Sequence, residues 1–171
     1  MNVNTNNPRW WGDAHTSGWE RVKEAMHRDW EQTKADFSGG KSGKELRQDA
    51  GDTVGQALGN QRIPAGDRPN PPDPGDVREA ARKQDQLVEQ FNARTERDVA
   101  PISRRLDAAR WEDAQHPMRF GHGAGSHYSD NWDDAFEPRL RKDWEESYPG
   151  QRWEDARELA RVGWNQARLT T

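Results

Sequence analysis

Apolar residues recur along this chain with the period of an α-helix. Between Trp19 and Phe37 they follow each other three or four residues apart, while charged residues occupy the opposite face. This pattern predicts an amphipathic helix that begins at Ser17 or Gly18 and ends at about Phe37, before a glycine pair that favours chain reversal.

The same pattern returns near the C-terminus. In each copy two tryptophans stand eleven residues apart, at Trp19/Trp30 and at Trp153/Trp164. Eleven residues make about three helical turns, so both rings of a pair lie on one face of a helix. A looser version spans 132–144, and the segment 110–114 (Arg-Trp-Glu-Asp-Ala) repeats only the opening found at 152–156.

Four further stretches have helical periodicity, and no stretch has the alternation typical of a strand, so the predicted fold class is all-α. These predicted helices are 42–58, a long helix over 77–114 with a kink at Pro101, a short helix from 132 with a new start at Pro138, and 152–168. Residues 1–18 are predicted to form an irregular arm, and 116–128 a glycine-rich loop. The proline-rich stretch 60–76 is predicted to be an extended linker between the parts 1–59 and 77–171.

The composition predicts a small core that depends on tryptophan. Only 30% of the 171 residues are hydrophobic, 33% are charged and the mean hydropathy is −1.34. Leu, Ile, Val and Phe make up about 12%, a level typical of disordered chains, but the net charge of −4 is small and nine tryptophans are available for burial. The predicted core residues are Trp19, Val22, Met26, Trp30, Phe37, Leu87, Phe91, Trp132, Trp144, Trp153 and Trp164.

Three histidines in the predicted loop, His116, His122 and His127, are the candidate metal ligands, because imidazole is a common ligand and carboxylates follow at 130–134. Their spacing matches no zinc signature, so a polar loop that contains histidines by chance is the competing interpretation. The glycines at 121, 123 and 125 lack the Lys-Ser/Thr of a P-loop. The many carboxylate pairs are explained by helix starts, where negative charge opposes the helix dipole. We therefore expect no catalytic residues and no cofactor, which predicts a protein that is not an enzyme.

Two features could serve interaction. The pair Trp10 and Trp11 is either a plug that folds back on a neighbouring helix or an exposed docking patch. The predicted helix 77–114 needs a partner for its apolar face, either within the chain, in a second copy or in another protein. Arginine clusters at 104–105 and 139–142 are the places where nucleic acid would bind, but interleaved charges argue against it. No apolar run could span a membrane and no signal peptide is evident, so a cytoplasmic protein is expected.

The first sixty residues resemble the CsbD-like family of small bacterial stress proteins. The matching residues are Trp19, Lys23, Trp30, Lys34, Phe37, Gly40-Lys41 and the amphipathic stretch 48–59. The C-terminal part resembles an uncharacterised bacterial module with Asp143-Trp144-Glu145 and Gly163-Trp164 elements. Such proteins are similar to hydrophilins, which implies a role in osmotic, starvation or desiccation stress and brings no catalytic residues. The alternatives are a self-associating or protein-binding helical module, and a metal-binding protein.

Overall fold

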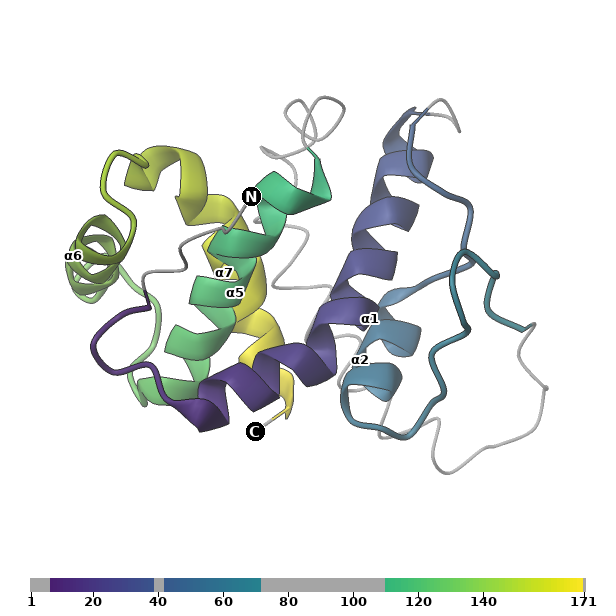
Figure 1. The fold of residues 1–171 in the computed structure, drawn as a ribbon, viewed down its shortest axis with the longest axis horizontal. Helices are drawn as coiled ribbons and strands as arrows, with labels where there is room; N and C mark the ends of the chain where they lie inside the picture. Colours follow the sequence, from purple (N-terminus) through teal and green to yellow (C-terminus); the bar gives the residue numbers. More distant parts are fainter. Residues whose placement is uncertain (1–6, 39–41, 72–109, 171) are drawn as a thin grey trace.

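The computed structural model describes residues 7–38, 42–71 and 110–170, and this part of the chain is helical without any strand. The all-α prediction is therefore confirmed. The helices are α1 (Asp13–Ser38), α2 (Ala50–Ala57), α5 (Trp111–His127), α6 (Glu137–Ser147) and α7 (Trp153–Thr170). Figure 1 shows α5, α6 and α7 grouped on one side and α2 on the other, with α1 reaching both groups. Most of the predicted long helix, up to residue 109, lies outside the described residues.

Helix α1 begins earlier than predicted. It starts at Asp13, whose carboxylate lies in the first turn, where it interacts favourably with the helix dipole. The backbone N–H of Thr16 already donates to the carbonyl of Gly12, over 3.2 Å. Of the predicted irregular arm, only residues 7–12 in the described part are non-helical.

Helix α2 is shorter than the predicted 42–58 because the preceding residues bind α1 instead. A Cβ on Gly43 would lie 2.3 Å from the carbonyl oxygen of Glu31, so the chain passes α1 at a distance that only glycine allows. The side-chain oxygen of Gln32 accepts the backbone N–H of Leu46 over 2.7 Å. Helix α2 then starts after its N-cap residue Asp49. The side chains of Asp49 and Asp52 accept each other's backbone N–H, a capping box that satisfies donors left free at the helix start.

The first part of the predicted linker, 60–71, is not an extended spacer but is bound to α1 and α2. The buried guanidinium of Arg28 donates to the carbonyls of Gly66 and Arg68 over 3.0 and 2.9 Å, and to Gln48 and Asn70. Asn70 is itself buried and donates to the carbonyl of Arg47. A hydrogen-bonded polar network, rather than apolar burial, therefore fixes this segment.

The loop predicted at 116–128 is wrong, because these residues form α5. Gly121 and Gly125 are buried against α7 in the most extensive helix–helix contact of the described chain. A Cβ on Gly121 would lie 1.7 Å from the carbonyl oxygen of Ala160, and one on Gly163 would lie 1.9 Å from that of Met118. The packing gained by this close approach outweighs the helix cost of glycine and of Pro117 within the helix.

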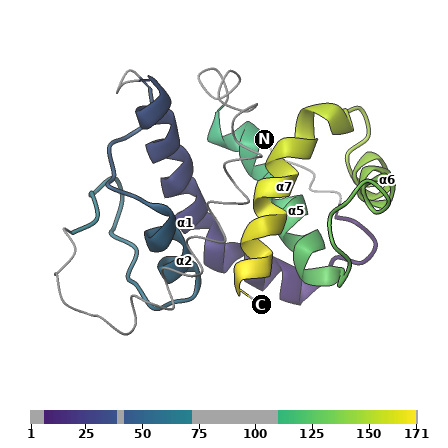
Figure 2. The ribbon, with the colours of Figure 1, turned by 180° about the vertical axis from the view of Figure 1, so that it is seen from behind.

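The contact between α5 and α7 is reciprocal. Both helices open with Arg-Trp-Glu-Asp-Ala, 42 residues apart, and in that register Gly121 corresponds to Gly163 and Met118 to Ala160. Each glycine thus contacts the counterpart of the residue that the other glycine contacts. From Gly121 beside Ala160 to Gly125 beside Trp164, the contacts advance in the same direction along both helices. Helices α5 and α7 therefore run parallel, as Figures 1 and 2 also show.

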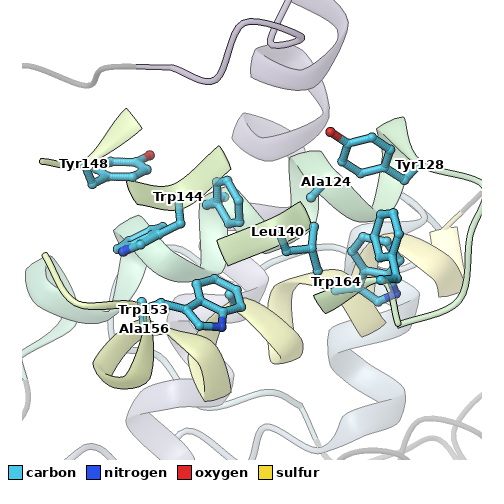
Figure 3. Packing of buried hydrophobic residues seen from close by; sticks show 11 residues of the cluster. Ala124, Tyr128, Leu140, Trp144, Tyr148, Trp153, Ala156 and Trp164 are labelled. Atoms are coloured by element: carbon cyan, nitrogen blue, oxygen red, sulfur yellow. The ribbon is translucent and has the colours of Figure 1, made fainter. Parts of the chain in front are cut away.

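The aromatic core fills the space between α5, α6 and α7 (Figure 3). Phe120 meets Trp144 edge to face at 5.3 Å, and Trp144 stacks on Tyr148 at 4.2 Å. Aromatic pairs of this kind contribute about 1 kcal/mol each beyond their buried area. We define this core by its buried members: Phe120, Ala124, Tyr128, Phe136, Leu140, Trp144, Tyr148, Trp153, Ala156, Ala160 and Trp164.

A second cluster joins α1 to both groups of helices. Trp19, Val22, Met26 and Trp30 are buried on one face of α1, and they share this α1 cluster with Ala57, Ala114 and Met118. The predicted parts 1–59 and 77–171 therefore pack together where they are described. Of the other predicted core residues, Trp144, Trp153 and Trp164 are buried and Trp132 is partly buried against the aromatic core. The Phe37 side chain, Leu87 and Phe91 lie outside the described residues.

Helix α6 starts at Glu137, one residue before the start predicted at Pro138, whereas the short helix predicted from Trp132 is not formed. The carboxylate of Asp133 accepts the backbone N–H of Phe136 over 2.9 Å, which forms a turn where a short helix was predicted. Glu137 then anchors α6 to α7. Its carboxylate accepts hydrogen bonds from Nε and Nη2 of Arg157 over 2.6 and 2.8 Å, and from the indole N–H of Trp153 over 3.2 Å. Burial raises the pKa of Glu137, but these hydrogen bonds outweigh burial and lower it overall.

Candidate functional site

A group of titratable and aromatic side chains lies where residues 7–12 meet α5 and α6. Trp10 stacks on His127 with ring centroids 4.8 Å apart and an interplanar angle of 11°. His15 lies edge-on to Trp10 at 5.4 Å and to His127 at 5.6 Å. We call this group, Trp10, Trp11, His15, His127, Tyr128 and Asp143, the His–Trp site. It combines two imidazoles, two indoles, one phenol and one carboxylate from four segments of the chain.

Asp143 of α6 is the polar anchor of the site. Its Oδ2 atom accepts the indole N–H of Trp10 over 2.8 Å and the hydroxyl of Tyr128 over 2.6 Å. Burial and this carboxylate together raise the pKa of Tyr128 to about 12, so the phenol stays protonated and keeps donating at neutral pH. The guanidinium of Arg139 lies 4.5 Å from the Tyr128 ring centroid and places a positive charge beside this pair.

Trp11 occupies a space that a glycine of α5 leaves open. A Cβ on Gly123 would lie 2.1 Å from the Trp11 ring, so only glycine fits beneath it. Arg119 lies above the same ring at 3.9 Å from its centroid, a cation–π contact worth on the order of 1 kcal/mol, and donates to Asn7 over 2.8 Å. Both indoles of the pair thus pack back on the molecule, which is the arrangement that the plug interpretation describes.

His15 is held by the backbone next to it. Its Nδ1 atom accepts the backbone N–H of Gly12 over 2.9 Å, which requires that nitrogen to carry no proton. Burial and the nearby His127 lower the pKa of His15 below its ordinary value of 6.5. At neutral pH the ring is therefore uncharged, with its proton on Nε2.

His122 lies deeper, between α1 and α5. Its side chain is 3% exposed, it meets Trp19 edge to face at 6.0 Å, and neither ring nitrogen has a hydrogen-bond partner within the described part of the chain. Burial, reinforced by His15 and Arg21, lowers its pKa to about 4. A buried, neutral imidazole of this kind is typical of a side chain that packs in the interior rather than one that binds a ligand.

The structure does not bring the three predicted metal ligands together. His116, His122 and His127 are spaced six and five residues apart on α5, which turns them to different faces of the helix. No group of three or more histidines and carboxylates in metal-binding geometry occurs among the residues described. The histidine that does lie near His127 is His15, from the segment predicted to be irregular.

The remaining sequence candidates are explained by the fold. Glycines 121 and 125 are buried against α7, and 123 faces Trp11, so none of them lines a phosphate-binding loop. Arg141 and Lys142 on α6 form exposed ion pairs with Glu145, Glu154 and Glu146. Among the described helices, none has the length and apolar character that crossing a membrane requires.

Sequence reasoning missed His15, Asp143 and Arg28. His15 and Asp143 are 128 residues apart along the chain, and the Asp143-Trp144-Glu145 element gives no sign of a contact with His15, so only the folding of residues 7–12 onto α5 and α6 brings them together. Arg28 lies on the polar face of the predicted helix, where a solvated side chain is the ordinary expectation. The signal available was the nearby run of amides at 48, 56 and 61, which can satisfy a buried guanidinium.

Comparison with known proteins finds no counterpart: no family model, no curated protein and no solved structure matches this chain. The resemblance to CsbD-like proteins therefore stays a prediction from the residues that carry it.

Proposed function

We propose that this is a non-enzymatic, hydrophilic helical protein of the stress-associated type, which keeps a hydrated, folded surface when water activity falls. The observation that carries the proposal is the separation of aromatic and charged side chains. Within the described residues Leu58, at 39% exposure, is the only large hydrophobic side chain that is exposed, although the chain has nine tryptophans. Such a surface offers little apolar area for aggregation during drying.

The surface charges support the same proposal because they are paired at short range. On α6, Arg141 lies 2.8 Å from Glu145 and 3.1 Å from Glu154, and Lys142 lies 3.9 Å from Glu146. Exposed pairs of this kind add little stability in dilute solution. Each charged group is hydrated in solution. As the protein dries, the ion-pair partner replaces the lost water, so no charge is left unpaired.

The proposal predicts protection of a client protein. A drying-sensitive enzyme is dried and rehydrated with this protein, or with an equal mass of serum albumin, and its recovered activity is measured. We expect severalfold higher recovery with this protein, and recovery of its own helical circular dichroism and indole emission after rehydration. Recovery no better than with albumin contradicts the proposal.

A matched variant separates charge from mere presence of protein. Replacing Arg141, Lys142, Glu145 and Glu146 by glutamine removes two charges of each sign and leaves the net charge at −4. We expect this variant to fold like the parent but to protect less. Equal protection by the variant would show that paired surface charge is not responsible.

A further inference from the structure

Residues 8–12 cover part of the aromatic core through Trp10. Its ring lies 6.1 Å from Phe120, 5.7 Å from Tyr128 and 4.8 Å from His127, measured between centroids. The segment is short. Its side chains are held by hydrogen bonds from Trp10 to Asp143, from Trp11 to Thr16 and from Arg119 to Asn7. At its C-terminal end, the carbonyl of Gly12 accepts the backbone N–H groups of His15 and Thr16, and the N–H of Gly12 donates to the ring of His15. Of these contacts, the one between Gly12 N–H and the His15 ring depends on the protonation of an imidazole.

The contact between Gly12 and His15 can exist only while His15 is neutral. The backbone N–H of Gly12 points at Nδ1 over 2.9 Å. A proton on Nδ1 turns that nitrogen into a donor, so two N–H groups would face each other at hydrogen-bond distance. Protonation thus converts one of the contacts that join this segment to α1 from attraction to repulsion.

The groups around His15 offer a protonated ring little attraction, and burial and the nearby His127 lower its pKa. On α1 itself, Asp13 lies two residues away, and α5 contributes His127, His122 and Arg119, which are all neutral or positive. Helix α6 contributes Arg139 and Asp143, and the Oδ2 atom of Asp143 already accepts from Trp10 and Tyr128. The ring of His127 lies close to that of His15, with 5.6 Å between their centroids.

His127 contacts the segment through its ring, which is stacked on Trp10, whereas His15 contacts it through a hydrogen bond that a proton on Nδ1 removes. The decisive proton is therefore the one on His15.

We propose that residues 8–12 form an acid-released latch, which holds Trp10 and Trp11 on α5 and α6 while His15 is neutral and releases them when His15 is protonated. Release uncovers the Phe120 and Tyr128 rings and the space above Gly123. The latch goes beyond the proposed hydrophilic role, because it gives the protein a second, more apolar surface in mildly acidic surroundings. Burial of His15 places this transition below pH 6.5.

Fluorine NMR of the full chain labelled with 5-fluorotryptophan tests the latch. The Trp10 resonance is assigned with Trp10→Phe and followed from pH 7.5 to 5, with the Trp144 resonance as the internal control for an intact core. We expect the Trp10 resonance to move to the position of a solvent-exposed indole while that of Trp144 stays in place. A Trp10 resonance that is independent of pH overturns the proposal.

The matched variant is His15→Gln, whose side-chain oxygen can accept from Gly12 at every pH. We expect its Trp10 resonance to stay at the neutral position at pH 5, and the same acid shift in this variant would overturn the proposal. If His15→Gln fails to fold, the wild-type His15 ring is titrated by carbon–proton NMR. Its titration midpoint and that of the Trp10 resonance must then coincide, and midpoints separated by a full pH unit would also overturn the latch.

Discussion

His122 is buried and Asp29 is half-buried, and their pKa values shift in opposite directions. Burial lowers the pKa of His122 to about 4 and raises that of Asp29 to about 7, in the latter case against a hydrogen bond of 3.2 Å from Thr53. The unfolded chain therefore binds more protons at His122, and the folded chain binds more at Asp29. Between about pH 4 and 6.5 these two effects on the free energy of unfolding oppose each other.

His122→Phe is expected to expose the contribution of Asp29. In the wild type, His122 stabilises the fold fully above pH 6.5, and this contribution is lost as the pH falls towards 4, by about 3 kcal/mol in all. Without it, the free energy of unfolding should decrease as the pH rises from 4 to 7, by at most about 1.4 kcal/mol per pH unit. Urea unfolding at several pH values measures this slope. A wild type and variant with the same slope would contradict the prediction.

Asp29→Asn is expected to do the reverse. The amide keeps an acceptor for Thr53 but cannot ionise, so the variant should be more stable than the wild type at pH 8 and equal to it near pH 4. Its free energy of unfolding should rise between pH 4 and 6.5, since the histidines whose pKa is lowered by burial, His122 above all, bind more protons in the unfolded chain. The same urea series serves as the measurement, and a variant no more stable at pH 8 would rule out an ionised, desolvated carboxylate.

At the scale of elements, apolar periodicity explains where the sequence predictions succeeded, and glycine explains where they failed. The apolar periodicity located α1, α6 and α7 correctly, apart from a few residues at their ends. The prediction failed at α5 because Gly121, Gly123 and Gly125 are poor helix formers by local propensity. Their contacts with Ala160, Trp11 and Trp164 are tertiary, so no local pattern reveals them. The same limit concealed the His–Trp site, whose members meet only after α5 has formed.

The glycine contact between α5 and α7 predicts a large difference between two similar substitutions. Gly163→Ala would place a methyl group 1.9 Å from the carbonyl oxygen of Met118, and should cost about 3 kcal/mol or more of unfolding free energy. Gly18→Ala, inside α1, meets nothing closer than the edge of His122 at 3.4 Å, and should stabilise by up to about 1 kcal/mol. Thermal unfolding followed by circular dichroism compares the two. If the two substitutions changed the unfolding free energy equally, the close contact between α5 and α7 would not contribute to stability.

On the scale of the whole molecule, the described chain is held by two different kinds of interior. Aromatic rings fill the space between α5, α6 and α7, whereas amides and a guanidinium hold 60–71 against α1 and α2. The composition predicted the first kind, because nine tryptophans need burial. It could not predict the second, because an arginine among amides has the same composition whether it is exposed or buried.

Arg28→Lys tests the polar interior. Lysine cannot reproduce the forked donors that reach Gln48, Gly66 and Arg68 together, so we expect a loss of about 2–4 kcal/mol and faster tryptic cleavage within 60–71. The matched control is Arg141→Lys on the exposed face of α6, which should change neither quantity measurably. Denaturant unfolding and a timed digest provide the two measurements. Similar results for both variants would indicate that Arg28 is not a structural tie.

The reciprocal contact of α5 with α7 pairs two helices of one chain in the way that two copies of one helix pair in a symmetric dimer. Each helix carries the surface that fits its own counterpart, and α6 with its flanking turns tethers the two at a high local concentration. A chain with one such helix would need a second molecule, and its folding would depend on how much protein was present. Here pairing is intramolecular, so the α5–α7 unit should assemble equally well at any dilution.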